Sequence, residues 1–157
     1  MTDTAASRPD WHGRLVLAGL LLGVGTVAMV DEVVFHQLLH WHHFYDRSTT
    51  AAGLVSDGLF HAFSWFATVA SLFLVGGVLR ERAFWAAAFG AGWLTGAGLF
   101  QLYDGLVQHK LLGLHQIRYG VELAPYDVVW NVAAGLLLAG GVFLWARTAR
   151  LANSAAG

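Results

Sequence analysis

Four apolar stretches without Asp, Glu, Lys or Arg divide the chain, at residues 15–30, 58–79, 83–103 and 128–146. A helix needs about 20 mostly apolar residues to cross a bilayer, and runs of about 18 or more are candidates. Three of the stretches reach that length. The first is shorter, but it continues past Asp31 and Glu32 into a further apolar segment. The pattern predicts an all-α, polytopic membrane protein, a bundle of four transmembrane helices.

The composition agrees with this pattern and narrows the chemistry. Apolar residues make up 57% of the 157 residues and charged residues only 12%, whereas soluble domains contain about 25% charged residues. The net charge of -1 provides no basic surface for nucleic acid. Cysteine is absent, which excludes disulfides, thiolate metal sites and a cysteine nucleophile. The unusual feature is eight histidines, nearly as many as the nine lysines and arginines together.

The basic residues are distributed asymmetrically about the predicted helices. One side of the membrane carries six arginines: Arg8, Arg14, Arg80, Arg82, Arg147 and Arg150. The opposite side carries Arg47, Lys110 and Arg118. Because cytoplasmic loops are enriched in Lys and Arg, both termini are predicted to be cytoplasmic. We expect a multi-pass protein of the plasma membrane, surrounded by the lipid bilayer.

The two halves of the chain repeat one another. At an offset of 73 residues, Gly19, Gly23, Gly25, Asp31, His36 and His42 meet Gly92, Gly96, Gly98, Asp104, His109 and His115. At an offset of 70, Asp57 meets Asp127, whereas His61 meets Asn131. We interpret this as two parallel two-helix repeats, about 14–80 and 83–150, in one membrane domain spanning 1–157. Residues 1–10 and 151–157 are expected to be flexible tails. The glycines allow close helix packing, within the chain or in a homodimer.

Polar residues gather in the outer half of the predicted bundle. Seven of the eight histidines map there, with five acids: Asp31, Glu32, Asp57, Asp104 and Asp127. In an up-down-up-down bundle the helix ends that carry them meet at one depth. Asp31 lies about 24 Å along its helix, inside a hydrocarbon core of about 30 Å. An acid at that depth is costly, so it is expected to face the bundle and to have a partner.

This layer predicts a metal site toward the extracytoplasmic face. Imidazole and carboxylate bind divalent transition metals well, so zinc, copper(II) or iron fits, whereas Cu(I) is disfavoured. The predicted ligands are Asp31, His36, Asp57, His61, Asp104 and His109, and the predicted outer residues are Glu32, His40, His42, His115, Asp127 and Asn131. Metal handling and redox or hydrolytic chemistry are alternatives at this stage, and the pattern does not decide whether the protein is an enzyme.

Helical spacing suggests which of these side chains pair. Asp57 and His61 are four residues apart and should share a face of their helix, as should Glu32, His36 and His40. Asp31 and His36 are five apart, about 140° around an ideal α-helix, so they should not share a face. His43 has no histidine counterpart in the second repeat and is expected to face the loop.

Two other functions use the same residues. His36 and His109 could be the axial ligands of a b-type haem in an electron carrier, although haem ligation does not require the acids. Alternatively, Asp and His could relay protons in a proton-coupled transporter. The inner halves of the first and third helices offer few polar groups for such a path. A purely structural subunit of a membrane complex is a further alternative.

Two motifs carry a resemblance to a known family. The run from Val30 to His43, VDEVVFHQLLHWHH, and the segment Tyr126 to Asn131, YDVVWN, are long and specific. They resemble an uncharacterised prokaryotic membrane-protein family, domain of unknown function 2243, over about residues 11–147. The resemblance implies a bacterial or archaeal four-helix membrane protein. It implies no activity and no catalytic residue.

Overall fold

The computed structural model describes residues 10–155, and every regular element in that range is a helix. The α-helices are α1 (Trp11–Val30), α2 (Thr50–Arg80), α3 (Ala86–Leu102) and α4 (Ala124–Ser154). Local signals fix several starts. The Asp10 side chain accepts a hydrogen bond from the Gly13 amide, and the Thr49 hydroxyl accepts one from the Ala52 amide. Each thereby satisfies an amide of the first turn that has no partner within the helix.

Both α1 and α3 change to a wider helix at their C-terminal ends. α1 continues as the π-helix η1 (Asp31–Leu38), and α3 continues as the π-helix η2 (Tyr103–Leu111). π-helical segments are rare and occur frequently at functional sites. η1 begins at Asp31, and η2 begins at Tyr103, directly before Asp104. Asp31 and Asp104 are the first acids of the two predicted repeats.

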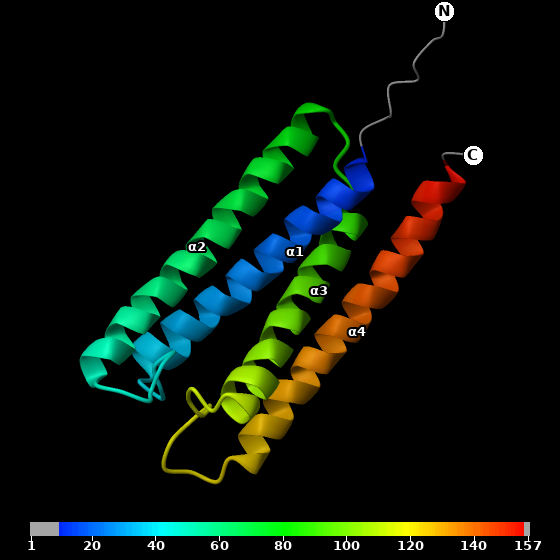
Figure 1. Ribbon diagram of the computed structural model, residues 1–157. Coiled ribbons are helices and arrows are strands. Elements are labelled where there is room, and N and C mark those ends of the chain that lie inside the picture. The colour runs from blue at the N-terminus through cyan, green and yellow to red at the C-terminus, as the bar shows by residue number, and fades with distance from the viewer. Residues whose placement is uncertain (1–9, 156–157) are drawn as a thin grey trace, which may run out of the picture.

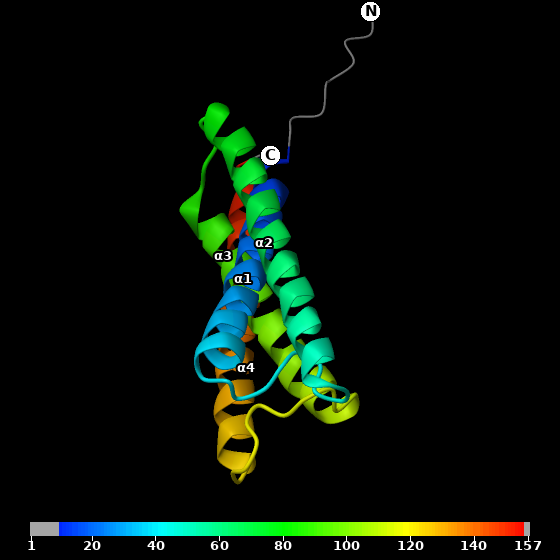
Figure 2. The ribbon, with the colours of Figure 1, turned by 90° about the vertical axis from the view of Figure 1, so that its left-hand side faces the viewer.

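The four α-helices run alternately up and down, with α1 and α3 in the middle of the assembly (Figure 1). α2 packs against α1, and α4 packs against α3. The loops that join α1 to α2 and α3 to α4 lie at one end of the molecule in both views (Figures 1 and 2). The start of α1 and the end of α4 lie at the opposite end. The outer helices therefore flank a central pair instead of completing a square bundle.

Glycine allows the central pair to touch backbone to backbone. A Cβ atom added to Gly19 would collide with the Phe89 carbonyl oxygen, and one added to Gly92 would collide with the Val16 carbonyl oxygen. An offset of 73 residues relates these two contacts to each other. Gly25 packs against the backbone of α2 at Ser64 and Thr68, and Gly98 packs against the backbone of α4 at Ala134 and Leu138. The offset of 70 residues relates these two pairs of positions. Small residues at such crossings are typical of helix pairs in membranes.

Three helices in the described range are long and apolar enough to cross a membrane: Trp11–Leu38, Thr50–Arg80 and Ala124–Ser154. The α-helical part of α3 has 17 residues and continues into η2. Large apolar side chains such as Phe66, Phe73 and Phe143 are exposed on the outer helices. Such surfaces suit lipid and not water.

Helix boundaries differ from the sequence prediction mainly by extension. α2 begins at Thr50, before the apolar run at 58, and α4 extends through Ser154, past the expected end of the second repeat at 150. Part of the predicted C-terminal tail is therefore helical. The rest of the predicted tails, at 1–9 and 156–157, lies outside the described residues.

Candidate metal centre

Histidines and acids converge where η1, η2, their loops and the start of α2 meet. Eight of them are almost completely buried: Asp31, Glu32, His36, His42, Asp57, Asp104, His109 and His115. Three groups have ligand atoms that all lie within 4.8 Å of one another: His42, His109 and His115; Asp31, His36 and His42; and Glu32, His36 and Asp57. These eight residues are called the polar centre below.

The π-helices bring together residues that an α-helix would separate. A π-helix pairs residue i with residue i+5, so side chains five apart lie about one turn apart on the same side. Asp31 Oδ2 lies 3.7 Å from His36 Nε2, and Asp104 Oδ2 lies 3.1 Å from His109 Nε2. The expectation that Asp31 and His36 do not share a face, which assumed α-helical geometry, is therefore wrong.

His42 and His115 enter the centre from the two loops in equivalent ways. His42 Nδ1 donates to the Ile117 carbonyl at 2.9 Å, and His115 Nδ1 donates to the Phe44 carbonyl at 2.9 Å. Their rings stack, with centroids 4.5 Å apart and planes inclined by 6°. Burial lowers the pKa of His42 to about 2, and the nearby His115 and His36 act in the same direction. His42 is therefore neutral at physiological pH.

These backbone contacts determine the tautomer of both rings. A carbonyl oxygen can only accept, so Nδ1 of each ring carries a hydrogen. In the neutral ring Nε2 then bears a free lone pair, which is the form that binds metals. The sequence analysis expected His42 and His115 among the outer residues of the site. The structure instead places their Nε2 atoms in its interior.

The atoms of the centre that could bind a metal are buried and have no hydrogen-bond partner among residues 10–155. This applies to Nε2 of His36, His42, His109 and His115, and to one oxygen each of Asp31 and Asp104. Buried polar groups are normally paired, and unpaired ones indicate an absent water or ion. His115 Nε2 lies 3.5 Å from Asp104 Oδ1. Tetrahedral ligands with bonds of 2.0–2.1 Å are about 3.3 Å apart, so the donor separations of 3.1–3.7 Å suit a coordination sphere.

A second layer of acids orients His36. Its Nδ1 lies 2.9 Å from Glu32 Oε2 and 3.2 Å from Asp57 Oδ1. Asp57 also accepts from His43 Nδ1 at 2.6 Å and from the Phe44 amide at 2.8 Å. A carboxylate on Nδ1 fixes the ring and raises the basicity of Nε2, as in the carboxylate–histidine–metal arrangement.

The second repeat lacks this support. The residues equivalent to Glu32 and Asp57 are Gly105 and Asp127. Asp127 is half-buried and pairs with Lys110 at 2.6 Å, away from the centre, and His109 Nδ1 has no partner. Asn131 donates to the Asp127 carbonyl at 2.8 Å. Asp127 and Asn131, predicted as outer residues, therefore do not contact the imidazoles.

Two predicted histidines lie outside the centre. His61 is exposed on α2, and Asp57 pairs with His36 and His43 in place of the predicted His61. η1 ends at Leu38, so His40 does not continue the helical stripe from Glu32 and His36. It is exposed, in the left-handed backbone region with φ of 50°. The expectation that His61 joins Asp57 in the site is therefore wrong, as is the expected helical stripe from Glu32 and His36 to His40.

Two residues of this region were missed by sequence reasoning. His43 was expected to face the loop, yet only 24% of its side chain is exposed because it binds Asp57. Gln108 is buried next to His109 with Oε1 unpaired. Since neither residue has a counterpart of its own type in the other repeat, the duplication gave no signal for them.

The acids of the centre have no fixed cation in the described residues. Every ion-pair partner of Asp31, Glu32, Asp57 and Asp104 there is a histidine. Buried carboxylates need compensation by a cation or by protonation. Four buried carboxyl groups whose ion-pair partners in the described residues are all histidines therefore favour a site that binds cations.

The packing of the rings weighs against haem. His36 and His42 have centroids 4.6 Å apart, and His109 and His115 are also 4.6 Å apart. With the stacked pair His42–His115, these contacts form a continuous chain of imidazoles from His36 to His109. A macrocycle between those two axial ligands would have to displace the intervening rings, whereas metal ions would not.

Comparison with known proteins places this architecture in a family. The family model described as a predicted membrane protein, DUF2243, matches residues 18–148. The chain belongs to this family. The match covers all eight residues of the polar centre and both π-helices. No curated protein and no solved structure matches the chain.

Proposed function

We propose that this DUF2243 membrane protein is a metalloprotein whose polar centre binds two divalent transition-metal ions. The observation that carries the proposal is the convergence of four buried, unpaired Nε2 atoms with carboxylate oxygens. We assign the donors to two sets related by the repeat. In the first, the ligand atoms of Asp31, His36 and His42 lie within 4.8 Å of one another. In the second, Asp104 lies 3.1 Å from His109 and 3.5 Å from His115.

The donor chemistry restricts the metals. All ligands of both sets are nitrogen or oxygen, which suits zinc, copper(II) or iron. The thioether of Met29 accepts from the Ser64 hydroxyl at 3.8 Å and does not belong to either set. Two metal ions with oxygen and nitrogen ligands could support metal handling or redox or hydrolytic chemistry.

The proposed membrane arrangement has four crossings formed by a duplicated two-helix hairpin. The reciprocal glycine contacts and the reciprocal His42 and His115 hydrogen bonds support the duplication. The distribution of arginine supports cytoplasmic termini in the plasma membrane. The centre then lies near the extracytoplasmic face.

A polar pocket offers the corresponding entry route. It has a volume of about 280 Å³ and is lined by His40, Trp41, His42, His43, Asp46 and Tyr119. His42 belongs to the centre, whereas His40 is exposed at the surface. The buried hydroxyls of the opposite half, such as Ser71 and Thr95, donate to backbone carbonyls. They do not form a proton path, which supports a metal centre over a transporter.

Elemental analysis and an absorption spectrum of protein purified without added metal test the proposal. We expect about two divalent transition-metal ions per chain. Exhaustive dialysis against a chelator should remove them, and either zinc, copper(II) or iron should restore them. Protein that contains no stoichiometric metal and takes up none on titration would contradict the proposal, and a Soret band would favour haem.

Glu32→Gln is expected to weaken metal binding without removing a ligand. The substitution keeps the shape of the side chain, but a neutral amide supports His36 Nδ1 less well than a carboxylate. Loss of such a partner typically lowers metal affinity about 10- to 100-fold. Competition with a chromophoric chelator would measure the change. Gln37→Ala is a control, because Gln37 contacts Glu32 at 2.8 Å but not the imidazoles.

A further inference from the structure

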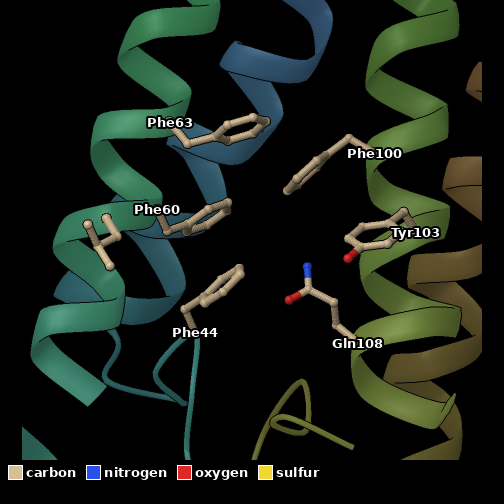
Figure 3. Close-up of a pocket in the computed structure, with 7 residues that line it drawn as sticks. Phe44, Phe60, Phe63, Phe100, Tyr103 and Gln108 are labelled. Carbon is tan, nitrogen blue, oxygen red and sulfur yellow. The ribbon is translucent and has the colours of Figure 1, made fainter. Parts of the chain in front are cut away.

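An aromatic pocket opens beside the polar centre, between α2 and α3. It has a volume of about 370 Å³, within the usual range for small-molecule sites. Figure 3 shows Phe44, Phe60 and Phe63 on one side and Phe100 and Tyr103 on the other. Phe63 and Tyr103 are partly exposed on faces of the membrane-facing helices. A ligand dissolved in the bilayer could therefore enter from the side.

One polar side chain projects into this apolar space. Gln108 extends from η2 toward Phe44 and Phe60, as Figure 3 shows, and only 1% of it is exposed. Its Oε1 is buried without a hydrogen-bond partner. An unpaired buried amide is costly in an apolar pocket, so it indicates a ligand with a hydrogen-bonding group at that point.

The pocket is in contact with the proposed metal ligands. The Phe60 ring lies 5.6 Å from the His36 ring, and the Phe44 carbonyl accepts from His115 Nδ1. Gln108 directly precedes His109 in the chain. A ring held against these aromatic side chains would lie one side chain away from the imidazoles.

The second repeat provides an internal comparison. The offsets of 73 and 70 relate Phe44, Leu59 and Phe60 to Ile117, Val129 and Trp130, which line a pocket of about 390 Å³ between η1 and α4. Phe35 occupies the place of Gln108 there. The two pockets have related walls, but only the pocket between α2 and α3 has the buried amide.

We propose that the pocket between α2 and α3 binds the ring of a membrane-dissolved hydroquinone. Aromatic walls favour a flat ring, and a ring hydroxyl can donate to Oε1 and accept from the amide nitrogen of Gln108. A lipid acyl chain would leave the amide unpaired. Hydroquinone binding does not require a metal. A role of the hydroquinone as a substrate of the polar centre, in contrast, rests on the proposed metal site.

Calorimetric titration of the protein in lipid nanodiscs tests the proposal. The probe is a decyl-substituted hydroquinone, and decylbenzene is the control ligand, with the same ring and tail but without oxygen. We expect the hydroquinone to bind at least tenfold more tightly than decylbenzene. Equal binding would show a groove for apolar chains and would overturn the proposal.

Matched variants locate the site. Leu59 and Val129 are equivalent, and both are 70% exposed, so tryptophan at either position fills one pocket without disturbing the core. Leu59→Trp should abolish hydroquinone binding, Gln108→Leu should weaken it at least tenfold, and Val129→Trp should leave it unchanged. Unchanged binding in Gln108→Leu, or equal loss in Val129→Trp, would overturn the proposal.

Metal content measured on the same preparations separates the two proposals. The three variants are expected to retain the metal content of the unmodified protein, since none of the substituted residues is a ligand. Hydroquinone binding by protein that contains no stoichiometric metal and takes up none on titration would refute only the metal centre. Two bound metal ions with no preference for hydroquinone would refute only the pocket assignment.

Discussion

Alanine at both His36 and His109 is expected to remove nearly all transition metal from the purified protein. The two rings belong to different donor sets, and each has an unpaired Nε2 atom facing the acid five residues earlier in its own π-helix. Each single substitution should therefore reduce the metal content from about two ions per chain to about one. Elemental analysis of protein that elutes as a folded species measures the effect.

The chain contains its own control histidines. His61→Ala and His40→Ala remove imidazoles that lie in sequence among the ligands, but both side chains are exposed outside the centre. They should retain two ions per chain. If His61→Ala lost as much metal as His109→Ala, the metal would be bound at the surface, and the proposed centre would be wrong.

The sequence predicted the helical fold and the layer of the site because both depend on position along the chain. Apolar run length located the helices, and the repeat offset related Asp31 to Asp104 and His36 to His109. Depth in the membrane is nearly independent of local geometry. The membrane character and the convergence of these four residues were therefore accessible without coordinates.

The sequence could not predict which acid pairs with which histidine in this layer, because the pairing depends on local helix geometry. Side chains five residues apart point in directions about 140° apart in an α-helix, but in a π-helix they lie about one turn apart on the same side. The change to π-helix at η1 and η2 therefore decides whether Asp31 reaches His36. The stripe that was predicted to include His40 stops because η1 ends at Leu38. No pattern of apolar residues distinguishes the two helix types at this length.

The loop histidines illustrate a second limit. The offset identified His42 and His115 as equivalent, but their direction depends on backbone carbonyls from the opposite loop. Each ring is thus oriented by the other repeat. Such a contact can be predicted only when the packing of the two hairpins is known. That packing depends in turn on the glycines of α1 and α3.

Gly92→Ala is accordingly expected to destabilise the protein strongly. Its added methyl group would collide with backbone atoms of Val16 and Leu20, which cannot move aside as a flexible side chain could. Overpacking typically costs about 1–3 kcal/mol, occasionally more, and here it would separate α1 from α3. Because η1 and η2 continue these helices, the two donor sets would also move apart. We expect a lower midpoint of thermal unfolding in detergent and loss of bound metal.

Gly90→Ala is the matched control on the same helix. A Cβ atom there would meet nothing within 4 Å, and alanine favours a helix over glycine by about 1 kcal/mol. This variant should be as stable as the unmodified protein or more so, with full metal content. If the two variants unfolded at the same temperature, close contact of α1 and α3 would not be what holds the hairpins together. If Gly92→Ala unfolded earlier but retained both ions, the centre would not depend on that contact.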